Sequence, residues 1–329
     1  MAEQAYSHVS VLGAGGWGTA LAATAARAGR RVNLWARDGS LLVDISAGEN
    51  PKYLPGIDLP EDISVTTSLS VAAGGEVILL AVPAQVTRAL VNQLLPLLKG
   101  DAPLVICAKG IERDTGKLLH EMLAEAAPGH PVAILSGPSF AREVALGLPT
   151  AVTIAGAGAE RLQATLSTPG LRPYAGDDIT GVALGGAAKN VYAIACGVVE
   201  GLKLGENARA ALLARSFAEL ARLGEALGAK RETLMGLSGL GDLMLSATSR
   251  SSRNFSAGVE LGGGKQATSL SAPGHALAEG VATAPALVAR AKQAGIELPI
   301  AEAVADLLAG KLPLEQAVAR LMNRKLTSE

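Results

Sequence analysis

A glycine-rich turn near the start of the chain constrains its fold more than any other feature. The apolar run His8–Leu12 predicts a strand and leads into the letters GAGGWG; Thr19–Ala28 predicts a helix and Arg31–Trp35 a second strand. A GxGxxG motif placed between a strand and a helix is the dinucleotide-binding fingerprint. Its glycines here are Gly13, Gly15 and Gly18. We therefore predict a βαβ unit whose helix start binds a pyrophosphate through backbone N–H groups.

Three further apolar runs in the first half predict strands: Glu76–Val82, Leu104–Ala108 and Val132–Leu135. Helical stretches such as Gln85–Leu98 separate them, and Asn50–Pro60, which contains three prolines, predicts an ordered loop. Near-continuous apolar strands that alternate with helices indicate an α/β fold with a doubly wound parallel sheet.

The pattern changes after residue 180, where only helices are predicted. They cover Val182–Val199, Asn207–Leu227, Asp242–Ser249, His275–Ala294, Ile300–Ala309 and Leu314–Asn323. We predict a Rossmann-like dinucleotide-binding domain over residues 1–180 and an all-helical substrate and catalytic domain over residues 181–329. A substrate is expected between two such domains, where pockets tend to form.

Composition narrows the class of protein. Of the 329 residues 49% are hydrophobic and 18% charged, a globular composition, and the net charge of −1 argues against nucleic acid as a partner. Cys107 and Cys196 lie in apolar runs without metal-ligand spacing, which predicts buried thiols and no metal site. The longest uncharged run, Val144–Ala159, is shorter than the roughly 20 residues that span a bilayer. We expect a cytoplasmic protein without membrane insertion; its oligomeric state is left open, a homodimer included.

One charge interrupts the apolar segment Val182–Val199, namely Lys189. Burying an ammonium costs on the order of several kcal/mol unless a partner compensates it. Either Lys189 reaches past its small neighbours to solvent, or it is a catalytic lysine that transfers protons. In the second case Asp242, after the glycine-rich Gly236–Gly241, is the predicted compensating carboxylate. The alternative for Asp242 is a plain helix N-cap.

Polar groups follow two predicted strands and one predicted helix. Lys109 and the segment Ser136–Ser139 come directly after apolar strands, and ligands of such sheets bind at the carboxyl ends of the strands. The segment Ser249–Asn254 combines arginines, hydroxyls and an amide, which is the chemistry of phosphate recognition. Exposed turns are the alternative in both places.

The end of the second strand bears on the choice of cofactor. Asp38 stands about 20 residues past the fingerprint, where an acid binds the ribose 2′-hydroxyl of NAD, whereas an arginine accommodates the 2′-phosphate of NADP. Arg37 precedes it. We favour NADP and allow NAD; Arg37 as a solvated loop charge is the alternative.

Eight motifs, taken together, resemble one family over the whole chain. The motifs GAGGWGTALA, AVPAQ, AKGIE, LSGPSFA, KNVYAIACG, GLSGLGDLMLSATS, SRNF and AEGVAT occur here in the order typical of bacterial-type NAD(P)-dependent glycerol-3-phosphate dehydrogenase. The resemblance implies reversible reduction of dihydroxyacetone phosphate to sn-glycerol 3-phosphate, a supply for phospholipid synthesis.

The resemblance also implies roles for particular residues. Lys189 is the expected proton donor in reduction, assisted by Lys109 and Asp242. The expected substrate contacts are Lys109, Gly137, Ser139, Asp242, Ser252, Arg253 and Asn254. The expected cofactor contacts are the fingerprint glycines together with Gly16, Trp17, Arg37, Lys109, Ala141, Arg253, Leu277 and Glu279. Family members often have serine at the position of Gly16, so only a side-chain hydroxyl is lost here. The alternatives are another two-domain hydroxy-acid or acyl-CoA dehydrogenase, or an NADPH-sensing protein without turnover.

Overall fold

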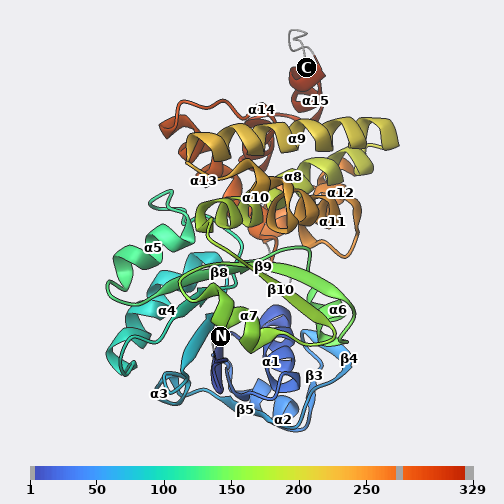
Figure 1. Ribbon diagram of the computed structural model, residues 1–329. Coiled ribbons are helices and arrows are strands. Elements are labelled where there is room, and N and C mark those ends of the chain that lie inside the picture. The colour runs from blue at the N-terminus through green and yellow to red at the C-terminus, as the bar shows by residue number, and fades with distance from the viewer. Residues whose placement is uncertain (1–3, 272–276, 323–329) are drawn as a thin grey trace. The chain divides into compact units, whose positions relative to one another are not determined.

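The computed structural model describes residues 4–271 and 277–322 (Figure 1). The chain divides into two compact units. The first consists of Met1–Lys109 and Leu118–Ala183, and the second of Gly110–Lys117 and Leu184–Glu329. The boundary predicted after residue 180 lies three residues before this division. The short segment Gly110–Lys117 belongs to the second unit although strands of the first unit flank it in sequence.

Within the described residues, eight strands of the first unit form one sheet in the order β10-β9-β8-β7-β6-β1-β2-β5. Their bounds are β1 His8–Leu12, β2 Arg31–Trp35, β5 Ile63–Thr66, β6 Val77–Leu80, β7 Leu104–Ile106, β8 Val132–Ser136, β9 Thr150–Gly156 and β10 Leu171–Gly176. Neighbouring strands are parallel except β8 and β9, which pair antiparallel. The five predicted strands are all present, and the predicted α/β fold is confirmed.

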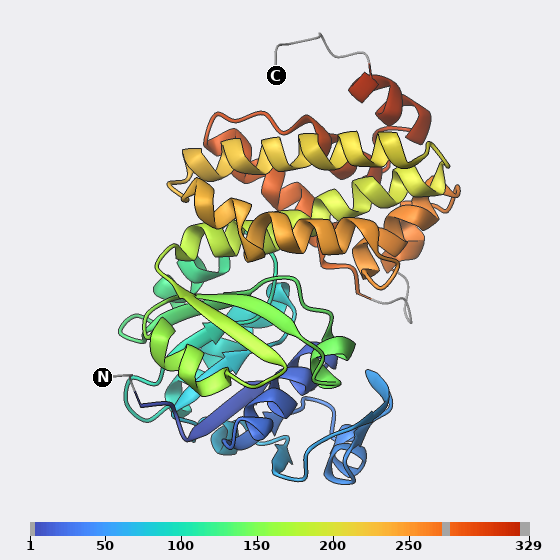
Figure 2. The same ribbon diagram turned by 45° about the vertical axis from the view of Figure 1, so that its right-hand side comes forward.

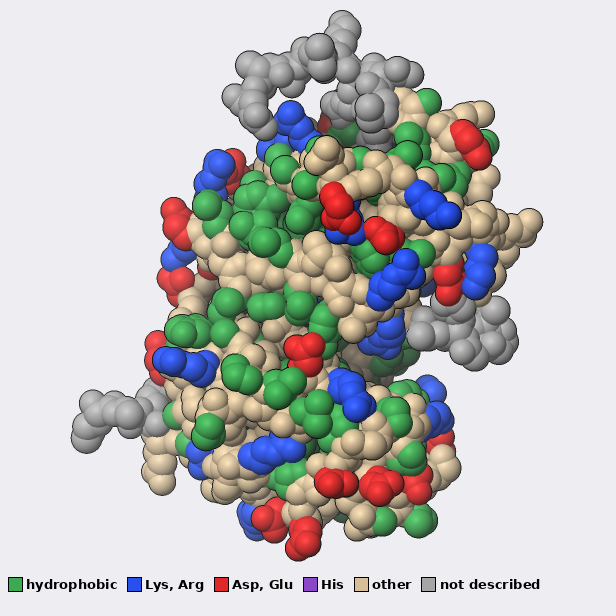
Figure 3. Space-filling model, turned by 90° about the vertical axis from the view of Figure 1, so that its right-hand side faces the viewer, with side chains coloured by type: hydrophobic (Ala, Val, Ile, Leu, Met, Phe, Trp, Pro, Cys, Tyr) green, Lys and Arg blue, Asp and Glu red, His purple; other side chains and the backbone are tan. Residues whose placement is uncertain are grey.

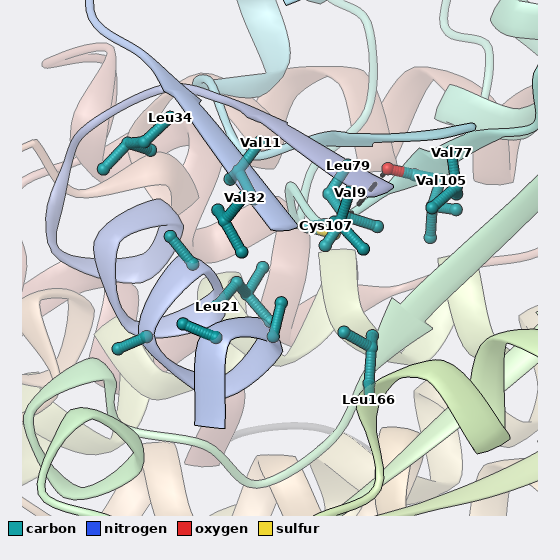
Figure 4. Packing of buried hydrophobic residues seen from close by; sticks show 14 of the residues in the cluster. Val9, Val11, Leu21, Val32, Leu34, Val77, Leu79, Val105, Cys107 and Leu166 are labelled. Carbon is teal, nitrogen blue, oxygen red and sulfur yellow. Dashed lines mark hydrogen bonds between the residues drawn. The ribbon is translucent and has the colours of Figure 1, made fainter. Parts of the chain in front are cut away.

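Helices lie on both sides of this sheet (Figures 1 and 2). They are α1 Gly16–Arg27, α2 Leu41–Ser46, α3 Leu69–Ala72, η1 Ala84–Val86, α4 Thr87–Leu94, η2 Leu95–Leu97, α5 Leu119–Ala126, α6 Ala141–Ala145 and α7 Ala159–Leu166. Figure 4 shows Leu21 of α1 and Leu166 of α7 in the cluster that covers one face. The alternate residues of the central strands, such as Ile78 and Leu80, are also fully buried. Burial on both faces explains why these strands read as continuous apolar runs.

The prediction of an ordered loop over Asn50–Pro60 was wrong. This segment contains most of an antiparallel hairpin of β3 Glu49–Asn50 and β4 Leu54–Asp58. The prolines suggested a loop, but Pro55 is accommodated because the hairpin forms a two-stranded sheet of its own, whose edges tolerate proline. Leu54 and Ile57 of β4 pack with Ala20 of α1, so tertiary packing stabilises a weak strand sequence.

Three strands of the main sheet were not predicted. They are β5, β9 and β10, at or near the edges of the sheet. Their burial alternates or is partial, and β10 contains an arginine and a proline, so no continuous apolar run marks them, although β5 and β9 are rich in β-branched residues. The sheet therefore extends further than the sequence indicated, and the antiparallel β9 interrupts its parallel pattern.

The second unit is helical, as predicted, with no strand among its described residues. Its elements are most of α8 Ile179–Gly201, α9 Glu206–Ala226, α10 Arg231–Met235, a π-helical turn η3 Leu237–Gly241, α11 Asp242–Thr248, α12 Arg253–Gly262, η4 Ala267–Ser271, α13 Glu279–Gln293, α14 Pro299–Leu308 and α15 Leu314–Met322. The starting residue predicted for one helix, His275, and the last residue predicted for another, Asn323, lie outside the described residues.

Helix α8 is long and apolar enough to cross a membrane, but 94% of its most apolar window is buried inside the protein. Glycines bring α12 close to it. A Cβ atom on Gly197 would lie 2.9 Å from the Cα of Gly258, and one on Gly201 would lie 2.8 Å from the Cα of Gly262. The two helix backbones therefore touch, which is typical of a core helix.

The two cysteines are buried thiols, as their apolar surroundings in the sequence predicted. Cys107 and Cys196 are free and buried, and burial raises the pKa of both thiols. On the face shown in Figure 3, acidic and basic side chains are interspersed with apolar ones. Such a face offers no extended positive field to a polyanion.

Candidate active site

The turn between β1 and α1 is shaped by its backbone. Gly13 has φ +118°, and a Cβ atom there would lie 2.9 Å from the carbonyl carbon of Ala81 in the loop after β6. A Cβ atom on Gly18 would overlap the carbonyl oxygen of Gly13. Only glycine fits these two places, because one requires a left-handed backbone and the other a close approach of helix to turn.

The same turn leaves room for a ligand. Gly15 has no atom within 4 Å of the place its Cβ would occupy, and it caps α1 without any side-chain hydrogen bond. The first turn of α1 contains no acidic residue. A helix start of this kind attracts phosphate through its N–H groups and its dipole. The turn therefore fits the pyrophosphate of a dinucleotide.

Asn50 of β3 holds this turn, a contact that the sequence did not reveal. Its side chain is fully buried, and its Nδ2 donates to the carbonyl oxygen of Ala14 (3.1 Å) and to Oγ1 of Thr19 (2.8 Å). The hairpin also approaches Gly16, whose Cβ would lie 3.3 Å from the carbonyl oxygen of Tyr53. No local pattern marks Asn50, because its partners lie 31 and 36 residues earlier.

Residues at the carboxyl ends of β7 and β8 form a second group. Lys109 Nζ donates to the carbonyl oxygen of Gly137 (2.9 Å), and Ser139 Oγ donates to the same oxygen (3.0 Å). Trp17 Nε1 of α1 donates to the carbonyl oxygen of Cys107 (3.0 Å). The first unit thus brings these predicted residues to the edge of the sheet where ligands bind in such folds.

The remaining predicted cofactor residues are divided between the units. Arg37 follows β2 and is exposed, and Ala141 begins α6, where its Cβ lies 3.6 Å from the place of a Cβ on Gly16. Arg253, Leu277 and Glu279 belong to the second unit. Arg253 and Leu277 are exposed, and Glu279 lies at the start of α13.

The second unit contains a buried charged group around Lys189, which is only 8% exposed. Its Nζ donates to Oδ1 of Asp242 (2.9 Å) and to Oγ of Ser246 (2.7 Å). Asp242 and Ser246 are each 1% exposed. Lys189 is therefore largely shielded from solvent, and the carboxylate predicted to compensate it forms an ion pair with it.

The glycines before Asp242 allow this arrangement. The N-cap of α11 is Gly241, so Asp242 is the first residue of the helix and its carboxylate contacts Lys189. Gly239 packs so closely on Leu234 that a Cβ atom would overlap the Leu234 backbone. The π-helical turn η3 thereby delivers Asp242 to α8; π-helical turns often occur at functional sites.

Ser246 is a member of the group that sequence reasoning missed. It lies four residues after Asp242, which places both side chains on one face of α11. Its Oγ is 3.3 Å from Oδ1 of Asp242, so the lysine, the carboxylate and the hydroxyl contact one another. The spacing would have indicated this residue once Asp242 was chosen.

Asn190, which follows Lys189 in the sequence, is hydrogen-bonded to Asn254. Asn254 Nδ2 donates to Oδ1 of Asn190 (2.8 Å), and Asn254 Oδ1 accepts from the backbone N–H of Gly280 (2.9 Å). Both asparagines are buried. Asn254, predicted as a substrate contact, thus also joins α8, α12 and the start of α13.

The two arginines of the segment Ser249–Asn254 have different surroundings. Ser252 is the N-cap of α12, where its Oγ accepts from the N–H of Phe255 (3.3 Å). Arg250 lies 3.6 Å from Glu200, which places it in an ion pair at the end of α8. Arg253 is exposed at the first position of α12. A guanidinium beside a capped helix start can bind a phosphate bidentately.

Comparison with known proteins agrees with this geometry. Family models described as the N-terminus and the C-terminus of NAD-dependent glycerol-3-phosphate dehydrogenase match residues 8–161 and 178–319. Glycerol-3-phosphate dehydrogenase [NAD(P)+] of Parvibaculum lavamentivorans is 52% identical and that of Rhodospirillum rubrum 51%; each alignment covers 99% of this chain, and 99% and 95% of the relatives.

A solved structure has the same fold. The crystal structure of glycerol-3-phosphate dehydrogenase from Coxiella burnetii superposes with a TM-score of 0.92 at 38% identity, covering 96% of this chain and 99% of that one. The two family models together cover both units, as do the alignments with the sequence relatives and with this structure. The chain belongs to the NAD-dependent glycerol-3-phosphate dehydrogenase family.

Proposed function

We propose that this protein reduces dihydroxyacetone phosphate to sn-glycerol 3-phosphate with a nicotinamide cofactor, and catalyses the reverse reaction. One observation carries the proposal within this family, namely the buried ammonium of Lys189 between Asp242 and Ser246. A buried charge of this kind is costly to keep, and reduction of a ketone requires a proton donor at its oxygen.

The first unit is the proposed cofactor domain. The bound nicotinamide supplies a hydride for C2 of the substrate. The turn Gly13–Gly18 would bind the pyrophosphate, and Trp17 would be fixed by its bond to the carbonyl oxygen of Cys107. We propose Lys109 as a cation at the substrate side of the sheet edge. Its Nζ donates to the carbonyl oxygen of Gly137, which also accepts from Oγ of Ser139.

Lys189 is the proposed proton donor to the C2 oxygen in reduction and the acceptor in oxidation. Asp242 compensates the charge of the ammonium, because its carboxylate lies 2.9 Å from Nζ in a buried place. Ser246 restricts the direction of the Nζ atom. Fixed donors aimed at a developing alkoxide cost little reorganisation during the reaction.

The start of α12 is the proposed phosphate site. Arg253 would bind the phosphate of the substrate together with Ser252 and Asn254, and this anchoring would place C2 for reaction. Asn254 keeps its orientation through Asn190 and Gly280, so α8 and α12 would hold the donor and the phosphate site in fixed register.

The biological setting belongs to the same proposal. We infer a cytoplasmic enzyme that supplies glycerol 3-phosphate for phospholipid synthesis. Dimer formation remains a prediction, which light scattering of the purified protein tests.

The test is loss of NADPH absorbance at neutral pH on addition of dihydroxyacetone phosphate, with unphosphorylated dihydroxyacetone as the control substrate. We expect rapid loss with the phosphate ester and little with the control, because the phosphate anchors the substrate. Cofactor binding without oxidation by either compound would contradict the proposal and favour a sensor.

A further inference from the structure

The carboxylate of Asp38, in the loop after β2, has a polar partner on each of its oxygens. Oδ1 of Asp38 accepts from the backbone N–H of Ser40 (3.0 Å), and Oδ2 lies 3.3 Å from Nζ of Lys52. Hydrogen bonds from Ser40, and then from Lys52, lower the pKa of Asp38, so the group carries its negative charge at neutral pH. In NAD-dependent members of this fold class the acid near this place accepts the ribose 2′-hydroxyl. Here each of its oxygens already has one partner, and one of the two partners is a cation.

Lys52 comes from the hairpin and not from the βαβ unit. It lies in the turn between β3 and β4, the hairpin whose Asn50 holds the cofactor turn. Its side chain is 53% exposed, and its Nζ lies 5.5 Å from the ring centre of Tyr53. An exposed ion pair contributes only about 0–1 kcal/mol to folding. The pair therefore contributes little to stability.

We propose that Lys52 is a specificity-determining residue that adapts the end of β2 to the 2′-phosphate of NADP. It neutralises Asp38, which would otherwise repel a phosphate and attract a 2′-hydroxyl, and it adds a second cation to that of Arg37. The inference rests on the proposed cofactor domain and deepens it. It assigns the determinant of cofactor specificity to the hairpin, a segment outside the fingerprint. Lys52 lies 14 residues after its partner Asp38.

The experiment is direct titration of cofactor fluorescence, without substrate, on the full-length protein. NADPH and NADH are each titrated into the wild type, Lys52→Met and the control Lys99→Met, which removes an exposed lysine elsewhere in the first unit. We expect Lys52→Met to weaken NADPH binding about tenfold, the size of one lost charge-assisted contact, and to leave NADH binding unchanged. The loss should shrink in high salt, because the contacts are exposed.

A second variant separates the two ways in which Lys52 can act. If neutralisation of Asp38 contributes, Asp38→Asn in the Lys52→Met background should restore part of the NADPH affinity. Equal weakening of NADPH and NADH by Lys52→Met, or no change in either, would overturn the inference. Wild-type turnover with dihydroxyacetone phosphate is measured separately, so failure of the proposed reaction is distinguishable from failure of this assignment.

Discussion

The cofactor turn and the Lys189 group are built in opposite ways. The turn is made of backbone within one short motif, in which Gly13 supplies a left-handed residue and Gly15 leaves an open space. The Lys189 group is made of buried side chains, with partners 53 and 57 residues along the chain. A motif can be read from neighbouring letters, whereas a side-chain group of this kind requires the helices to be packed first.

This difference predicts different consequences of mutation. Changes in the turn should act on cofactor affinity and leave the second unit intact. Changes in the Lys189 group should act on the chemical step and on stability, because its charges are buried and its partners depend on one another.

The largest effect is expected from Lys189→Met. Loss of the proton donor should lower kcat by about 10²- to 10⁴-fold, the usual range for general acid catalysis, while NADPH affinity stays near that of the wild type. Steady-state kinetics and cofactor titration measure the two quantities. The matched control is Lys292→Met, an exposed lysine of α13. A variant with nearly normal kcat would remove Lys189 from the mechanism.

Asp242→Asn tests the buried ion pair. Removal of one partner leaves the other charge uncompensated, which should cost about 3–5 kcal/mol of unfolding free energy. The double variant Lys189→Met/Asp242→Asn should regain part of that loss, because no buried charge remains unpaired. Urea unfolding measures both. Glu225→Gln, which breaks the exposed pair with Arg231, should change stability by less than about 1 kcal/mol. A strictly additive double variant would argue against the pairing.

Gly15→Ala tests the cofactor turn. Gly15 has φ −71° and ψ 177°, which alanine adopts without strain, so the melting temperature should not change. Its methyl group would occupy the space left for the pyrophosphate, so the Kd for NADPH should rise about tenfold or more. Gly13→Ala is the contrast, since its positive φ predicts a lower melting temperature as well. Unchanged NADPH binding by Gly15→Ala would place the pyrophosphate elsewhere.

A second buried carboxylate gives the smallest effect. Glu219 of α9 is 3% exposed and accepts from the N–H groups of Ile300 (2.7 Å) and Ala301 (3.3 Å) at the start of α14. Burial raises the pKa of Glu219 to about 7, while these hydrogen bonds oppose the rise. The folded state therefore favours the protonated form. This stabilising contribution is complete below the pKa of the unfolded chain and is lost as pH rises through about 7.

Between pH 6 and pH 8 the wild type should thus lose about 1.4 kcal/mol of unfolding free energy through this one group. Glu219→Gln should show a flatter dependence over the same interval. Urea unfolding at both pH values measures the difference. An identical slope in the two proteins would show that Glu219 does not titrate in this range.

The features predicted correctly are those that depend on residues close together in the sequence. The strands β1 and β2 have the predicted bounds, because their apolar letters are continuous and the glycine turn fixes their connection. The hairpin of β3 and β4 was missed, because its strands are short and contain proline. It is stabilised by packing of Leu54 and Ile57 on α1, which no local pattern records. Asn50 was missed for the same reason, whereas Ser246 lies four residues after Asp242 and its helical spacing would have indicated it.

The sequence by itself determined the α/β fold, the position of the cofactor turn, the helical second half and the presence of one charge in an apolar helix. Each of these depends on neighbouring residues, since strand and helix periodicity and the backbone freedom of glycine are local properties. Only the tertiary structure decided that Lys189 is buried against Asp242 and Ser246, and that Lys52 forms an ion pair with Asp38. Those contacts join residues far apart in the chain, and they exist only after the helices and the hairpin have packed.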